Sequence, residues 1–156
     1  MSRRLLLAAA AVLAAGLGVG LWLGLSGSGK AEPTRAAYLA EVSAVCRSYA
    51  RRLERVPAPG DPAAYGDVIA SLERVVPLLR AQEAAMRALP APEALRPRLE
   101  RLFALNRSSI SELEHALAAA RRRDAGGVAT RLGRFSGDRD QVHSLALAIG
   151  IACNPN

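Results

Sequence analysis

Hydrophobic and polar positions divide the chain into two regions of different character. Residues 5–25 carry no charged side chain, and Arg3 and Arg4 stand just before them. From residue 34 onward, apolar residues recur at spacings of three and four, which is the period of a helix with one buried face. The pattern predicts one membrane-type helix followed by an all-α domain.

The first apolar segment is long enough to cross a bilayer. A helix over its 21 residues is about 30 Å long, the thickness of a bilayer's hydrocarbon core. The arginines before it are expected to stay in the cytoplasm, which places the rest of the chain outside. Because the segment is longer than the usual apolar region of a signal peptide, we expect a retained single-pass anchor in the cell membrane. Small residues at 26–31 leave a cleaved secretory signal as the alternative.

Three glycines of this segment share one helix face: Gly16, Gly20 and Gly24. Small residues at four-residue spacing let a second helix approach closely, so the segment permits a homodimer in the membrane. Glycine is also frequent in membrane and signal segments in general, which is the simpler interpretation.

The rest of the chain divides into a flexible linker at 26–33 and one extracytoplasmic domain at 34–156. Amphipathic segments predict four helices, at about 34–56, 62–86, 93–123 and 128–149. Thr34 and Asp61 are suited to cap the first two helices, and Pro77 predicts a kink or break near residues 73–76. Gly126 and Gly127 are expected to end the third helix. Short connections favour an up-down-up-down four-helix bundle.

Composition and charge support a helical domain and argue against nucleic acid as a partner. Arginine supplies 20 of the 21 basic residues, and only 4% of residues are aromatic. Without Arg3, Arg4 and Lys30, which flank the apolar segment, 18 basic residues face 14 acidic ones. This excess is too small to indicate nucleic-acid binding.

The two cysteines, Cys46 and Cys153, favour a disulfide because an exported chain with an even number of cysteines is normally oxidised. A metal site would need further ligands at a recognisable spacing. Prenylation of Cys153 would require cytoplasmic enzymes, which an exported tail does not meet. The bond demands that the tail turn back along the first helix, with Gly150 ending the last helix and Ile151 providing an apolar contact at its end.

Two carboxylate-x-x-histidine pairs resemble the ligand pattern of di-metal centres in helical bundles: Glu112 with His115, and Asp140 with His143. The helical phase opposes such a centre, since His115 stands two residues from both Leu113 and Leu117 of the buried stripe. The carboxylates at 41, 73 and 83 are also poorly phased to complete it. We therefore expect no metal and no other cofactor.

Two groups of polar residues are candidates for binding. Asn106, with Ser109 beside it, lies on the apolar stripe of the third helix, where it either lines an internal ligand cavity or bonds to neighbouring groups. Six arginines are expected at the membrane-distal tip, where they would hold an anionic envelope polymer or an acidic protein: Arg51, Arg52, Arg55, Arg121, Arg122 and Arg123. The simpler interpretation of these arginines is solvated charge at helix ends.

Three segments carry a resemblance to other proteins: "YLAEVSAVC" (38–46), "ALPAPEALRPRLERL" (88–102) and "ALAIGIAC" (146–153). In these features the chain resembles a loose class of uncharacterised exported proteins from GC-rich bacteria, with one cysteine early in the first helix and another after a glycine near the end. The resemblance implies a helical bundle held by a disulfide, and it implies no activity.

The sequence has no phosphate-binding glycine loop, no Ser/His/Asp set in a recognisable motif and no HExxH motif. We therefore expect no enzymatic activity. The leading hypothesis is a membrane-tethered extracytoplasmic helical domain that binds a protein or polymer partner. The alternative is a carrier of a small molecule or metal in the bundle interior.

Overall fold

A computed structural model describes residues 32–61 and 64–153 of the chain. The predicted membrane helix, its glycines at 16, 20 and 24 and nearly all of the linker lie outside these residues. No helix in the described ranges is both long and apolar enough to span a bilayer.

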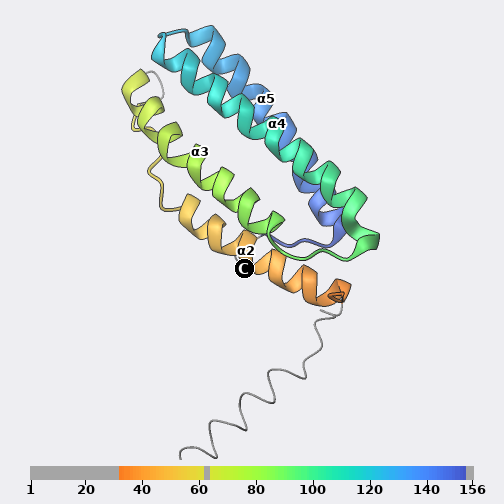
Figure 1. Ribbon diagram of the computed structural model, residues 1–156. Coiled ribbons are helices and arrows are strands. Elements are labelled where there is room, and N and C mark those ends of the chain that lie inside the picture. Colours follow the sequence, from red (N-terminus) through yellow and green to blue (C-terminus); the bar gives the residue numbers. More distant parts are fainter. Residues whose placement is uncertain (1–31, 62–63, 154–156) are drawn as a thin grey trace, which may run out of the picture. The chain divides into compact units, whose positions relative to one another are not determined.

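Regular structure in the described residues is entirely helical, which confirms the predicted all-α class (Figure 1). Each helix packs against the next one along the chain, and Figure 1 shows that neighbours run in opposite directions. The elements are α2 (Arg35–Leu53), α3 (Tyr65–Arg87), the short 3-10 helix η1 (Glu93–Leu95), α4 (Arg96–Arg121) and α5 (Ala125–Ile149).

The apolar stripes bury two clusters of side chains. At one end all four helices and the C-terminal tail meet around Tyr38, Val42, Phe103, Ile149 and Ile151. At the other end the core is made mainly by α3 and α4, with Leu53 of α2 and Phe135 of α5 at its margin: Val68, Leu72, Val76, Leu79, Ile110, Leu113, Ala116 and Ala120. The four predicted helices thus meet closely at one end only.

Local signals at the helix ends were correct in part. Thr34 caps α2, since its hydroxyl accepts a hydrogen bond from the Ala37 amide at 3.2 Å. The prediction of Asp61 as the cap of the next helix is wrong, because α3 begins at Tyr65 after Ala64. Instead, the Asp61 amide donates to the side chain of Asp67 at 3.0 Å.

Proline and glycine interrupt the helices less than expected. α3 continues through Pro77 without a break. Asp124 caps α5 by accepting from the Gly127 amide at 2.8 Å, so the two glycines at 126 and 127 form the first turn of α5 rather than the end of α4. α5 begins at Ala125, before the predicted start at about residue 128. The cap allows this because it satisfies an amide that has no partner inside the helix.

The C-terminal tail turns back along α2 as the disulfide requires. Gly150 has a left-handed φ of 100°, and the Ile151 amide donates to the Ala146 carbonyl at 2.9 Å. This hydrogen-bond pattern ends a helix and reverses the chain, and glycine adopts its left-handed residue without strain. The predicted roles of Gly150 and Ile151 are therefore confirmed.

A disulfide joins Cys46 to Cys153, as the sequence predicts, with 5.0 Å between their Cα atoms. Two hydrogen bonds support it, both on the side toward the start of α2. The Ala152 amide donates to the Ser43 hydroxyl at 3.1 Å, and Arg35 at the start of α2 donates to the Ile149 carbonyl at 3.1 Å. The disulfide and these two hydrogen bonds form a clasp that holds the end of α5 and the tail against α2. A stable disulfide is typical of an oxidising compartment and therefore hints at an extracytoplasmic location.

Candidate functional site

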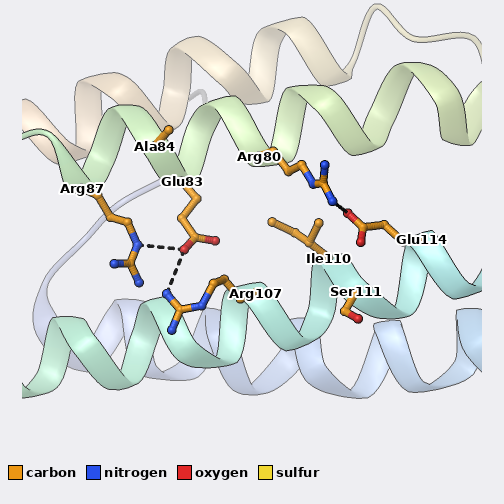
Figure 2. Close-up of a pocket in the computed structure, with 8 residues that line it drawn as sticks. All are labelled: Arg80, Glu83, Ala84, Arg87, Arg107, Ile110, Ser111 and Glu114. Atoms are coloured by element: carbon orange, nitrogen blue, oxygen red, sulfur yellow. Dashed lines mark hydrogen bonds and ion pairs between the residues drawn. The ribbon is translucent and has the colours of Figure 1, made fainter.

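A concave surface lined by five charged side chains lies between α3 and α4. It is an open groove of about 510 Å³. Its walls are formed by eight residues, drawn in Figure 2: Arg80, Glu83, Ala84, Arg87, Arg107, Ile110, Ser111 and Glu114.

Two ion pairs show the antiparallel register of the two helices that form this groove. Glu73 of α3 pairs with Arg121 of α4 at 2.7 Å, and seven residues further along α3, Arg80 pairs with Glu114, seven residues earlier on α4. Equal steps in opposite directions show that the helices keep one register over this length. In this register, charged side chains of α3 lie opposite side chains of opposite charge on α4.

Glu83 is the centre of the polar network. Its side chain is only 8% exposed, and a buried carboxylate is costly unless it is paired and hydrogen-bonded. Arg87 Nε donates to its Oε1 at 2.8 Å and Arg107 Nη1 to the same oxygen at 3.3 Å. Asn106 Nδ2 donates to Oε2 at 3.1 Å, so both oxygens have partners. Figure 2 shows the two guanidinium groups converging on the carboxylate.

A second contact holds Arg87 in place. Its guanidinium carbon lies 4.6 Å from the centre of the Phe103 ring, a cation–π arrangement. Arg87 thus touches both the carboxylate of its own helix and an aromatic side chain of α4. This double contact leaves the guanidinium with fewer accessible conformations than a free surface arginine has.

The positive and negative groups of the groove differ in depth. The side chains of Arg80, Arg87 and Arg107 are 65%, 42% and 55% exposed, whereas those of Glu83 and Glu114 are 8% and 33% exposed. The guanidinium groups therefore form the rim and the carboxylates lie below it. An approaching partner meets positive charge first, and planar guanidinium groups are suited to carboxylate or phosphate.

The four residues that resemble a di-metal ligand pattern lie in separate surroundings. Glu112 accepts from Arg131 of α5 at 3.1 and 3.3 Å, while His115, Asp140 and His143 are exposed to solvent. Within the described part of the chain, no group of three or more such ligands is placed to hold a metal ion.

The two polar residues on the α4 stripe have different surroundings. Asn106 is half-buried, bonds to Glu83 and also lines a small cavity next to the disulfide. Ser109 is buried, and its hydroxyl has no hydrogen-bond partner among the described residues. Ser109 is not among the residues that line the cavity beside Asn106.

The six arginines expected at one tip lie in two places. Arg51, Arg52 and Arg55 stand at the end of α2, and residues 121–123 stand at the turn between α4 and α5. Figure 1 shows the end of α2 well separated from that turn, because α2 is a shorter helix. The expectation that all six gather at one tip is therefore wrong. Arg52 also stacks on the Tyr49 ring at 4.8 Å, and Arg121 is paired with Glu73.

The residues that make the groove are not singled out from the sequence. The prediction that Glu83 is poorly phased to point into the bundle is wrong, because the Glu83 side chain is buried. A signal for it was present: residue 83 is four positions after Leu79 and three before Met86, so the stripe itself places it inside. Arg87 follows one turn later, at the spacing of a helical ion pair. Pairing with Arg107 depends on the register between α3 and α4, which no local pattern defines.

Comparisons with protein families, characterised proteins and solved structures give no match to this chain.

Proposed function

We propose that this protein is a non-enzymatic, membrane-tethered extracytoplasmic helical domain that binds an acidic partner in the groove between α3 and α4. The partner is a protein or an envelope polymer that presents carboxylate or phosphate groups. The observation that carries the proposal is the difference in depth between exposed arginines and recessed glutamates at one groove.

Pre-positioning of the arginines supports binding. Arg87 is held by Glu83 and Phe103, and Arg80 is held by Glu114, so little side-chain freedom is lost when a partner arrives. The buried Glu83 offsets part of the positive charge. The negative charge of Glu83 at the base of the groove disfavours an anion that would enter it. The groove therefore favours a partner whose anionic groups stay at the rim.

The tether rests on the apolar segment at 5–25 and its preceding arginines, and the disulfide suits the compartment that such a tether implies. A retained anchor leaves the intact chain in the membrane fraction after a wash at high salt. A soluble product that begins near residue 29 would show signal cleavage instead.

An interior carrier is the weaker alternative. The cavity beside Asn106 has a volume of about 70 Å³, roughly half of the space that holds a benzene molecule in an engineered protein core. The bundle interior therefore has no room for a large ligand at this place.

The test is site-specific photocrosslinking in the native envelope. A photoreactive phenylalanine analogue replaces Ser111, which lines the groove, or Ser136, an exposed serine of α5 that serves as the control. Adducts are expected at position 111 and not at position 136. Mass spectrometry identifies a protein adduct, and resistance to protease identifies a polymer.

Charge dependence is tested by two arginine substitutions on the same helix. Arg80→Gln is expected to reduce the adduct at position 111 several-fold, because it removes a guanidinium from the rim. Arg74→Gln, which changes an exposed arginine outside the groove, is expected to leave it unchanged. Absence of an adduct, equal adducts at both crosslinking positions or insensitivity to Arg80→Gln would each contradict the proposal.

A further inference from the structure

A second concave site lies where all four helices meet the C-terminal tail. It is a partly enclosed cavity of about 70 Å³, and the Cys46–Cys153 disulfide forms part of its wall. Its other apolar walls are side chains less than a tenth exposed: Met86, Leu102, Phe103, Val142, Ala146 and Ile151. Asn106 lies between this cavity and the groove, since it lines the cavity and bonds to Glu83 of the groove. The two sites share no lining residue.

Four polar side chains also line this cavity, and two of them, Arg139 and His143, are exposed to solvent. Arg139 and His143 stand one turn apart on α5, and the amides of Gln82 and Asn106 lie opposite them on α3 and α4. Each amide uses one hydrogen inside the protein, toward Cys46 Sγ at 3.2 Å and Glu83 Oε2 at 3.1 Å. An amide nitrogen has two hydrogens, so each retains one for a ligand. No aspartate or glutamate is found among the described residues that line the site.

Arg139 is the unusual member of this set. Within the described residues no carboxylate pairs with it, in contrast to Arg80, Arg87, Arg107, Arg121 and Arg131. Arg139 is exposed to solvent on one side, and the helices on its other side partly desolvate the guanidinium, which lowers the pKa of Arg139. A desolvated cation without a counter-ion is unfavourable, and an anionic ligand would relieve this cost.

We infer that this cavity binds a small amphipathic carboxylate, with its short hydrocarbon chain against Met86 and Phe103 and its carboxylate on Arg139 and His143. The volume admits a chain of about two to four carbon atoms, since about 150 Å³ accommodates benzene. The head group remains at the open mouth, where the guanidinium supplies paired donors for two carboxylate oxygens. This site has no lining residue in common with the partner-binding groove, although Asn106 and Phe103 in its wall contact Glu83 and Arg87 of the groove.

The chain provides a specific reporter for this site. It contains two methionines, Met1 and Met86, and Met86 lines the cavity. The full chain in a phosphocholine nanodisc, labelled with ¹³C at the methionine methyl groups, therefore gives one signal from the cavity and one control signal. Titration with butyrate is expected to shift the Met86 signal in a saturable manner and to leave Met1 unchanged. Butyramide, which has nearly the same shape and no charge, is expected to bind at least about tenfold more weakly.

Two substitutions separate the contributions of charge and volume. Arg139→Gln should weaken butyrate binding at least about tenfold, whereas Arg134→Gln, at an exposed position of α5 outside the cavity, should have no effect. Ala146→Leu should abolish binding by filling the apolar part, with circular dichroism confirming that the variant is folded.

The inference is overturned if butyrate leaves the Met86 signal unshifted, if butyramide binds as well as butyrate, or if Arg139→Gln binds like the unsubstituted protein. Each of these outcomes leaves crosslinking at Ser111 unaffected, so failure here is distinguishable from failure of the proposed partner-binding function.

Discussion

Replacing Cys46 and Cys153 together by alanine tests how much of the domain's stability comes from closing its longest loop. The two residues are 107 positions apart. In the chain-entropy model a cross-link over about 100 residues stabilises the folded state by about 4.7 kcal/mol. The unfolded chain is more compact than a random coil, so we expect a loss of about 3–4 kcal/mol.

The fold itself should survive this substitution. The tail keeps its hydrogen bond to Ser43, the Ile149 carbonyl keeps its bond from Arg35, and Ile151 stays buried in the core. A domain of this size typically has about 5–15 kcal/mol of stability, so most of the variant remains folded in the absence of denaturant.

Urea unfolding of the full chain, followed by far-ultraviolet circular dichroism, measures the loss. Tryptophan fluorescence is unsuitable because Trp22, the single tryptophan, stands in the N-terminal apolar segment. The midpoint should fall, and the dependence on urea should steepen because an uncross-linked chain exposes more surface on unfolding.

Reductant supplies the matched control. It should lower the stability of the unsubstituted protein to that of the variant and leave the variant unchanged. A loss of less than about 1 kcal/mol, or a variant that still responds to reductant, would refute loop closure as the main contribution of the bond.

Substitutions at three further positions address single features. Glu83→Ala should lower the free energy of unfolding in urea by about 1–3 kcal/mol, because it leaves the half-buried Asn106 amide and two guanidinium groups without their acceptor. Glu83→Leu should cost less because its side chain fills the space. Equal losses would argue that the hydrogen bonds of Glu83 do not stabilise the fold. Gly150→Ala should lower the free energy of unfolding by about 1–2 kcal/mol, since the residue has φ of 100° and an added Cβ would lie 3.2 Å from Leu39; an unchanged midpoint would contradict the tail geometry. Burial raises the pKa of the Tyr38 hydroxyl, so the folded protein keeps this proton at pH values where the unfolded chain loses it. The resulting stability is complete below about pH 10 and is lost as the pH rises through the higher folded pKa. Tyr38→Phe should remove this part of the alkaline pH dependence, and an identical pH profile would disprove the assignment.

Features encoded over a few residues could be predicted from the sequence. The four helices follow from apolar residues three and four positions apart, the Thr34 cap from its side chain, and the end of α5 from Gly150 followed by an apolar residue. The disulfide could also be anticipated, because it depends on compartment and cysteine number more than on detailed geometry.

Features that depend on how the helices meet could not be predicted from the sequence. Whether Glu83 is tolerated in the core depends on Arg107 reaching it from α4, and that contact exists only in the observed register. Gly126 and Gly127 favour a helix end in isolation, but the Asp124 side chain satisfies the first turn and lets α5 begin before them. The separation of the two arginine groups likewise follows from the unequal lengths of α2 and α4.

The clasp between α2 and the tail also determines how the domain responds to mechanical force. Residues 46 and 153 are 107 positions apart and are joined covalently, so the chain from one to the other forms a closed ring. When a ring is pulled at any two points, it extends only until its shorter arm is taut, which is at most about half of its length. At about 3.5 Å per residue, that limit is about 190 Å, however completely the helices unravel. A load applied through α3 and α4 would therefore stretch the domain over a bounded distance and then meet covalent resistance.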